Sequence, residues 1–318
     1  MINKNKISVL GCGVSGLSTG ILLLKKGYPV TIWAKDLPPN TTSNKAAAFW
    51  YPYLCNPKDK ARKWAKDTLI YFRNEILKDS SSGCINRTTI EVFDEAVGDP
   101  WWKHAVNGYG KLTKEELPYG YKDGYNIEGM VIDTSIYMDY LLEMFKRLGG
   151  QLVQRKVKDI QEPFEEYEIV VNCTGLGSRD LFDDEKIYPV RGQTVKVKPN
   201  GSELVIADDE GHNGLAYIVP RINDIVLGGT AQVNNLNLEV DPEDTKEILR
   251  KCAAVRPEFK NVEIISESVG LRAVRDEIRL EPENLSGKLV IHNYGHGGAG
   301  FTLSWGCAQN VVEIIEKL

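Results

Sequence analysis

The sequence lacks several features that would place a protein in a specialised class. Its 318 residues include only six cysteines, which are scattered and form no CxxC pair. We interpret them as reduced thiols of an intracellular protein. The chain has no excess of basic residues, because its net charge is −5, and this argues against a nucleic-acid coat or a polybasic membrane anchor. We therefore expect no nucleic acid among its partners.

One apolar run resembles a signal peptide or a single membrane span. Residues 7–24 are apolar or small throughout and follow two lysines. Glycines that weaken a continuous helix interrupt this run at four positions: Gly11, Gly13, Gly16 and Gly20. A buried strand, a glycine turn and a buried helix explain the run better, so we expect no membrane partner.

Hydrophobic periodicity predicts α/β character at both ends of the chain, with β-rich material between them. Strands at 6–10 and 29–34 flank a helix at 14–26, which begins a βαβ unit and a parallel sheet. Near the C-terminus we expect a strand at 288–292, a glycine-lined turn and a helix at 303–318. Between these ends the pattern indicates helices at 58–78, 133–148 and 242–255, strands at 151–157 and 168–172, and a β-rich region at 190–239.

This order fits an α/β fold (α+β overall) whose nucleotide-binding domain is discontinuous in sequence. We assign residues 1–55, 130–190 and 268–318 to a Rossmann-like domain with a parallel sheet. Residues 56–129 and 191–267 would form an antiparallel-sheet domain for the substrate. Residues 80–124 are rich in turn residues and aromatics, and the pattern does not define their short strands.

The N-terminal glycines form G-x-G-x-x-G directly after a strand and at the start of a helix. Gly11 permits a tight turn, Gly13 lets the backbone approach a pyrophosphate, and Gly16 lets helix and strand pack closely. The helix N-terminus then offers free N–H groups to phosphates. Asp36 is the nearest candidate for the acidic ribose ligand, and Lys35 precedes it. The alternative for the glycine loop is a turn that serves only packing. The alternative for Lys35 and Asp36 is that both are ordinary solvated loop charges.

A second glycine-rich segment occupies residues 293–302. His292 and His296 have the i, i+4 spacing of zinc ligands on a helix, but the intervening and following glycines make a helix improbable there. No carboxylate or cysteine completes a metal set nearby, so we expect no metal. A strand, a glycine turn and a helix N-terminus would instead press their backbone against a flat ligand.

Several segments together resemble the D-amino acid oxidase family of FAD-dependent amine oxidases. They follow the family's order over nearly the whole chain and comprise residues 9–18, 41–43, 46–54, 155–157, 171–175, 191–193, 217–220, 270–272 and 292–298. The resemblance implies a non-covalently bound FAD. It implies contacts with the diphosphate and adenosine at Gly11, Cys12, Gly13, Val14, Ser15, Gly16, Lys35, Asp36 and Val157. It implies contacts around the ribityl chain and flavin at Thr41, Thr42, Ser43, Ala47, Ala48, Phe49, Gly297, Gly298, Ala299, Gly300, Phe301 and Thr302, and it places Thr174 and Gly175 close to the cofactor.

The resemblance also implies roles at the substrate. An arginine is the natural clamp for an α-carboxylate because its planar fork binds both oxygens, and of Arg272, Arg275 and Arg279 the resemblance selects Arg272. The other two are expected in ion pairs. The Tyr217 hydroxyl would assist at the same carboxylate, and the Gly298 carbonyl would accept the amine. Hydride transfer from Cα to flavin N5 would give an imine that hydrolyses to a 2-oxo acid and ammonia, and O2 would be reduced to hydrogen peroxide.

One departure from the family's pattern concerns the substrate pocket. Many relatives carry a lid tyrosine where this chain has Asn213, and Tyr53 stands where some D-aspartate-selective relatives have histidine. An acidic run at 208–210 would repel an acidic substrate if it lies near the pocket. We therefore expect neutral D-amino acids as substrates. Packing alone remains the alternative role for Ala47, Ala48, Val157 and Tyr217.

Three other functions stay open, and so do the cellular location and the oligomeric state. The functions are D-aspartate oxidase, another amine oxidase of the glycine or sarcosine type, and a non-catalytic flavin-binding protein. The chain ends in Lys317-Leu318, which shares only its last two residues with the peroxisomal Ser-Lys-Leu signal. A cytoplasmic location, or a peroxisomal one in a eukaryote, is therefore expected. Base rates favour a homodimer if the chain is oligomeric.

Overall fold

The computed structural model describes residues 5–53, 55–209 and 211–317. Leu54 in the aromatic motif, Glu210 in the acidic run and Leu318 at the end of the expected last helix lie outside the described residues. The four N-terminal residues of the first expected domain segment lie outside them as well.

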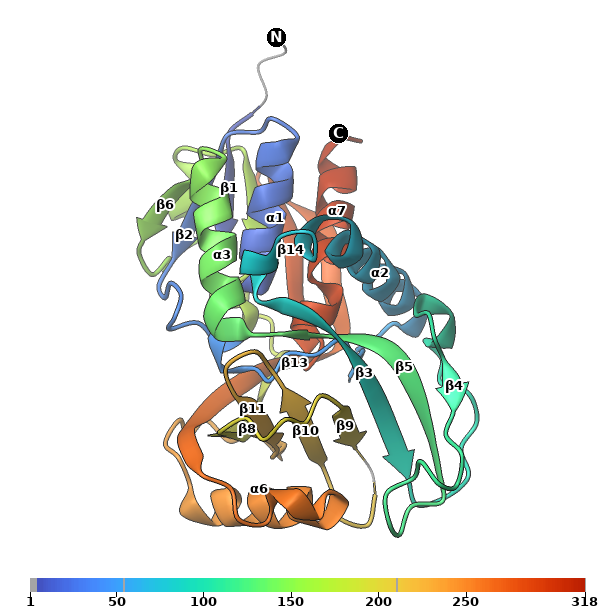
Figure 1. The fold of residues 1–318 in the computed structure, drawn as a ribbon. Coiled ribbons are helices and arrows are strands. Elements are labelled where there is room, and N and C mark those ends of the chain that lie inside the picture. Colours follow the sequence, from blue (N-terminus) through green and yellow to red (C-terminus); the bar gives the residue numbers. More distant parts are fainter. Residues whose placement is uncertain (1–4, 54, 210, 318) are drawn as a thin grey trace.

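Within these residues, fourteen strands join into one continuous sheet (Figure 1). One part is parallel: β1 (Ile7–Leu10) lies between β2 (Val30–Ala34) and β7 (Ile169–Asn172). β6 (Gln151–Gln154) pairs with β2, and β14 (Lys288–Gly297) pairs with β7. All residues of β1 and β2 are buried, as expected for parallel strands that are covered on both faces. The expected parallel βαβ unit is therefore confirmed.

The other part of the sheet is mainly antiparallel. Its strands are β8 (Tyr188–Val197), β9 (Val205–Asp208), β10 (Ala216–Pro220), β11 (Ile225–Gly228), β12 (Gln232–Val233), β3 (Cys84–Phe93), β4 (Gly110–Lys111) and β5 (Asp123–Ile132). Strands β3 and β5 are long partners that pair antiparallel over their whole length, where the sequence pattern indicated only short strands. β3 also pairs parallel with β9.

One strand connects the two parts. β13 (Ile264–Leu285) pairs with β8 through its first half and with β14 through its second half, with a register shift between Val274 and Arg279. No strand was expected here, because charged residues such as Arg272, Asp276 and Glu277 break the hydrophobic alternation. Pairing on both edges stabilises the strand in spite of that composition.

Seven α-helices of the described chain flank this sheet: α1 (Val14–Lys25), α2 (Lys58–Tyr71), α3 (Thr134–Arg147), α4 (Gln161–Phe164), α5 (Ser178–Leu181), α6 (Pro242–Val255) and α7 (Gly300–Ile315). Short 3-10 or π segments occur at Thr42–Lys45, Phe72–Ile76, Ser80–Ser82, Lys103–Ala105, Gly175–Gly177 and Pro257–Phe259. The carboxylates of Asp133 and Asp241 cap α3 and α6 by accepting bonds from Ser135 N–H (3.1 Å) and Glu243 N–H (2.9 Å). The three helices expected in the middle of the chain are therefore confirmed.

The expected order of strand, glycine turn and helix is present, but the turn comes at Gly298 and not directly after residue 292. β14 continues to Gly297 and remains paired with β13, and α7 begins three residues earlier than expected. Gly295 and Gly297 have φ values of +83° and +56°, so they bend the strand locally without ending it. Gly295 and Gly297 therefore lie in the sheet, Gly298 lies in the turn, and Gly300 begins α7.

The packing of α2 bears on the proposed division into domains. Trp64 Nε1 donates to Asn310 Oδ1 (3.2 Å), and Gly306 N–H donates to Thr68 Oγ1 (2.8 Å), so α2 packs directly on α7. One hydrophobic cluster unites α1, α2, α3 and α7, whereas another lies between the antiparallel strands and α6. By packing, α2 therefore goes with the parallel part, although its residues fall in the range assigned to the substrate domain.

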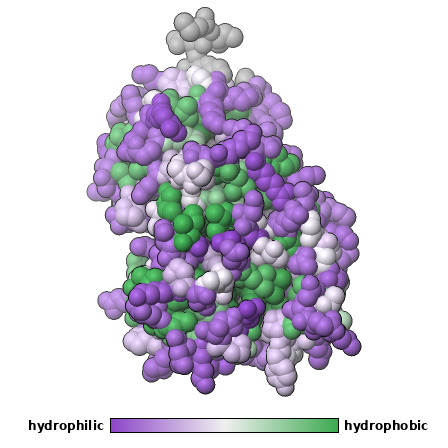
Figure 2. Space-filling view, in the orientation of Figure 1, coloured by the Kyte–Doolittle hydropathy of each residue, from purple (hydrophilic) through white to green (hydrophobic). Residues whose placement is uncertain are grey.

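Residues 7–24 form a strand, a loop and the 12-residue α1. In the ranges that the structure describes, every helix is too short or too polar to cross a bilayer. The six cysteines are all free thiols. Figure 2 shows a largely hydrophilic face with hydrophobic residues gathered near the junction of the parallel and antiparallel parts.

Candidate functional site

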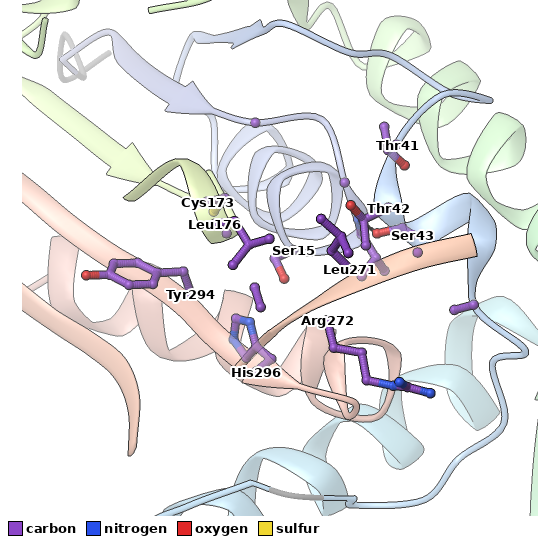
Figure 3. A pocket seen from close by; sticks show the side chains of 18 of the residues that line it. Ser15, Thr41, Thr42, Ser43, Cys173, Leu176, Leu271, Arg272, Tyr294 and His296 are labelled. Carbon is purple, nitrogen blue, oxygen red and sulfur yellow. Dashed lines mark hydrogen bonds between the residues drawn. The ribbon is translucent and has the colours of Figure 1, made fainter. Parts of the chain in front are cut away.

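A cavity of about 720 Å³ runs along the junction between the two parts of the sheet. It begins at the carboxyl ends of β1, β2 and β7, the edge at which open α/β sheets bind ligands, and it continues to β8, β10 and β13. It has the size of a small-molecule or cofactor site. Of the site residues expected from the sequence, all but Gly16 and Ala299 line it. Figure 3 shows Ser15, the 41–43 segment, Arg272 and His296 around this space.

The glycine loop at the start of α1 has the geometry that its sequence predicts. Gly11 has a φ of +105°, and a Cβ there would lie 2.5 Å from the Cys173 carbonyl oxygen. A Cβ on Gly16 would lie 2.9 Å from the Gly11 carbonyl carbon. Both positions therefore require glycine, and Gly16 acts through packing and not at the cavity surface. Burial raises the pKa of the Cys12 thiol to about 12, so this thiol stays neutral beside the loop.

The segment 41–49 is held against α1, α3 and β5. Val14 N–H donates to Ser43 Oγ (3.0 Å), and Thr134 Oγ1 donates to the Asn44 carbonyl (3.1 Å). Ala48 has a φ of +56°, which is uncommon for a residue other than glycine, and its carbonyl accepts from Ile132 N–H (2.8 Å). These bonds fix the segment as a wall of the cavity between the helix N-terminus and the antiparallel strands.

At the far end, next to β2, the cavity is polar. Lys35 and Asp36 line it and pair with each other at 3.3 Å, although both side chains are largely exposed. Sequence reasoning missed Trp33 and Arg155: the guanidinium lies 5.3 Å from the indole ring centre. Trp33 Nε1 is buried and has no hydrogen-bond partner among the described atoms. A buried donor of this kind needs a partner, which a bound ligand or a water molecule would supply.

The two histidines of the C-terminal motif have separate partners. His292 is fully buried and contacts Glu283 Oε2 (2.8 Å) and Asn172 Nδ2 (3.2 Å). His296 lines the cavity, and its Nε2 lies 3.1 Å from Asn293 Oδ1. Burial lowers the pKa of His296 to about 4, so the ring is neutral at physiological pH. Its contribution to the cavity wall was missed, because the sequence reasoning weighed it only as a metal ligand.

At the opposite end from β2, Arg272 and Tyr217 lie over glycines. Arg272 Nη1 donates to the Thr230 carbonyl (2.9 Å), and its guanidinium lies directly above Gly192, where a Cβ would stand 2.7 Å from Cζ. The Tyr217 ring covers Gly228 and Gly229, and a Cβ on Gly229 would stand 2.6 Å from its hydroxyl. Burial raises the pKa of Tyr217, and the neighbouring Arg272 lowers it in part. The hydroxyl is therefore protonated and can donate.

Strand register explains why these groups meet. Tyr217 on β10 pairs with Gly228 on β11, and Gly228 pairs with Thr194 on β8. Thr194 lines the cavity with a buried Oγ1 that has no hydrogen-bond partner in the described chain. Gly298 also lines the cavity, and a Cβ there would lie 2.6 Å from Tyr53 Cδ1. The tyrosine hydroxyl and the guanidinium are therefore neighbours in the wall of the cavity, and the Gly298 backbone forms another part of that wall.

The remaining arginines and the acidic run have distinct places. Arg275 pairs with Asp184 (3.0 Å), and Arg279 pairs with Glu281 and Glu283 (both 2.9 Å), which confirms the expected ion pairs.

The run 208–210 begins with the fully buried Asp208, which accepts bonds from Tyr121 OH (2.5 Å) and Gly211 N–H (2.7 Å). Asp209 lines the cavity instead. Asn213 Nδ2 lies 2.9 Å from His212 Nε2.

Comparison with known proteins supports one family. A family model described as FAD dependent oxidoreductase matches residues 6–314. A D-amino-acid oxidase of Dictyostelium discoideum is 50% identical, covering 99% of this chain and 92% of that protein. One from Rubrobacter xylanophilus is 41% identical, covering 96% and 94%, and a D-aspartate oxidase of Homo sapiens is 33% identical, covering 98% and 95%. The crystal structure of glycine oxidase from Geobacillus kaustophilus has a TM-score of 0.83 at 19% identity, covering 99% of this chain and 95% of that one.

Proposed function

The chain belongs to the FAD-dependent oxidoreductase family, and from that premise we propose that it oxidises neutral D-amino acids to 2-oxo acids, ammonia and hydrogen peroxide. The observation that carries the proposal is that Arg272, Tyr217 and the Gly298 backbone line the same cavity as the dinucleotide loop. The 50% identity to a D-amino-acid oxidase supports it.

The cavity fits FAD. Gly11 and Gly13 leave backbone exposed at the N-terminus of α1 for a diphosphate, and the neutral Cys12 adds no negative charge there. The partnerless Trp33 Nε1 and Thr194 Oγ1 supply buried polar atoms at two places along the cavity wall. Lys35, Asp36 and Val157 would hold the adenosine, the 41–49 segment and residues 174–175 the ribityl chain, and residues 297–302 the ring. When bound, FAD supplies the acceptor for the substrate's hydride and passes the electrons to O2.

The protein's own part is to bind and orient the substrate. Arg272 keeps one guanidinium nitrogen on the Thr230 carbonyl, which leaves further N–H groups for both oxygens of the α-carboxylate. The protonated Tyr217 hydroxyl donates to the same carboxylate. These bonds fix the substrate's Cα, which is the main contribution that positioning makes to the rate.

The amine is held by backbone and not by an acid or base. The Gly298 carbonyl accepts an N–H of the neutral amine, and the amine's extra proton goes to solvent on binding. His296 is neutral because burial lowers its pKa to about 4, so it adds no positive charge to the cavity. Because the amine binds in its neutral form, the reaction needs no side-chain base to deprotonate it.

The test combines a spectrum with an assay. The purified protein should show a flavin absorption spectrum and release peroxide with D-alanine but not with L-alanine. Arg272→Ala should lower kcat/KM for D-alanine by roughly 10²–10⁴-fold, because two hydrogen bonds to a charged group contribute about 3–6 kcal/mol. Arg256→Ala, which removes an exposed guanidinium paired with Glu258, is the control. A colourless protein that takes up no FAD would refute the proposal.

A further inference from the structure

The guanidinium of Arg272 is held by a neutral group. The side chain extends from β13 (Figure 3), and its Nη1 donates to the Thr230 carbonyl at 2.9 Å. By contrast, Arg275 and Arg279 on the same strand pair with carboxylates. A carboxylate partner would compete with a carboxylate ligand, whereas a carbonyl orients the guanidinium without neutralising it. Thr230 therefore fixes Arg272 and leaves its charge for a ligand.

Thr230 lies where the pairing along β8 is interrupted. β11 is the partner of β8 on one side of the interruption and β12 on the other, and the pairs that flank it are Gly228 with Thr194 and Gln232 with Arg191. Residues 229–231 therefore face only residues 192–193, so that three residues oppose two. This is the arrangement of a β-bulge, which bends a strand and redirects its groups.

The hydroxyl of Thr230 closes this bulge. Gln193 N–H donates to Thr230 Oγ1 at 2.9 Å, so the side chain accepts the bond that a backbone carbonyl accepts in a regular antiparallel ladder. The same residue thus binds β8 through its hydroxyl and Arg272 through its carbonyl. Because both bonds belong to one residue, the place of the carbonyl depends on the bond to the hydroxyl.

Gln193 is a rigid anchor for that bond. Its side chain is fully buried, and Nε2 donates to the Asp241 carbonyl (2.8 Å) and to Thr245 Oγ1 (2.9 Å). Its Oε1 accepts from Arg191 Nη2 (2.8 Å) and from Asp241 N–H (2.9 Å). Both donors and both lone pairs of the amide are therefore used, and they tie this part of β8 to the start of α6.

We propose that Thr230 is a positioning residue for substrate binding, which holds Arg272 in place through its carbonyl while its hydroxyl holds the bulge on β8. The inference rests on the proposed function, in which Arg272 binds the substrate's α-carboxylate. That carboxylate keeps its charge while the hydride leaves Cα, so the clamp stabilises the bound substrate and the transition state alike. A displaced clamp therefore raises KM and leaves kcat nearly unchanged.

The test removes the hydroxyl and keeps the shape of the side chain. In flavin-loaded Thr230→Val, KM for D-alanine should rise at least tenfold while kcat changes less than twofold. The Kd of propionate, which is D-alanine without its amine and is measured through the flavin spectrum, should rise by a similar factor. Thr230→Ser keeps the hydroxyl and should stay within threefold of the wild type in both quantities. Thr88→Val, at an exposed position of β3, is the matched control and should stay within twofold.

A second comparison separates positioning from a general effect on the fold. In the Arg272→Ala background, Thr230→Val should change kcat/KM for D-alanine less than twofold, because both changes act through one guanidinium. A loss there as large as in the wild-type background would overturn the inference. So would an unchanged KM and propionate Kd in Thr230→Val, or a Thr230→Ser protein as impaired as Thr230→Val.

The failures of the two proposals can be told apart. If the flavin-loaded wild-type protein does not oxidise D-alanine, the proposed function is wrong and this inference falls with it. If D-alanine is oxidised but the variants behave against expectation, the inference alone is wrong. Should Thr230→Val not fold, Thr230→Ala removes the hydroxyl without adding bulk. A tenfold rise in KM and propionate Kd in that variant supports the inference, and wild-type values overturn it.

Discussion

Gly192→Ala should impair substrate binding without unfolding the protein. A Cβ at position 192 would stand 2.7 Å from Cζ of Arg272 and 2.8 Å from its Nη2. Ordinary contacts between such atoms lie at about 3.5–4.0 Å, so the guanidinium must move by about 1 Å. The group that moves is the far end of a flexible side chain, so the fold can accommodate the change.

The size of the effect follows from that displacement. A misplacement of about 1 Å at a positioned group can cost roughly 10²-fold in rate. We therefore expect kcat/KM for D-alanine to fall by about that factor, chiefly through a higher KM, while the flavin spectrum is kept. The melting temperature should change by only a few degrees, because glycine and alanine differ by about 1 kcal/mol in a strand.

The assay is steady-state peroxide release over a range of D-alanine concentrations, with thermal unfolding measured on the same samples. Gly98→Ala is the matched control, because a Cβ there would meet no atom within 4 Å. In the Arg272→Ala background Gly192→Ala should have almost no further effect, since both changes act through one group. A Gly192→Ala enzyme with the wild-type KM would refute the assignment of Arg272 as the carboxylate clamp.

Two further predictions concern Tyr217 and His296. Tyr217→Phe should lower kcat/KM for D-alanine roughly 10- to 150-fold, because it removes one donor to a charged group worth about 1.5–3 kcal/mol; peroxide release measures this, and an unchanged kcat/KM would contradict the role. His296 has a folded-state pKa of about 4 against 6.5 for the free group, so its neutral form is favoured by folding, and stability should fall as the pH drops from about 6.5 to about 4. The loss is at most about 3 kcal/mol. Melting temperatures between these pH values should fall less steeply in His296→Gln, and equal slopes would contradict the prediction.

Local signals in the sequence were sufficient for the elements whose structure depends on neighbours along the chain. The glycine loop of residues 11–16 was predictable because its geometry is set by a strand, a turn and a helix that follow one another directly. The same holds for α3 and α6, whose capping carboxylates Asp133 and Asp241 lie next to the helices that they cap. The resemblance to a family then supplied candidate roles for Arg272 and Tyr217.

Strand pairing decided what the sequence pattern could not. The charged composition of β13 concealed a 22-residue strand, because its pairing on both edges is not visible in its own hydrophobic alternation. The same limit placed the glycine turn directly after residue 292 instead of at Gly298, since glycines that bend a paired strand and glycines that end one look alike in sequence.

The chain's amino-acid order by itself determined an FAD-type loop, the main helices and the class of chemistry. Only the tertiary structure decided that Arg272 lies above Gly192 and that Tyr217 lies above Gly228 and Gly229. The physical reason is that each of these contacts joins strands that are distant in sequence, and the register of their pairing sets which side chains share a face. Whether a position requires glycine depends on which atom lies close to it, and only the folded chain brings that atom near.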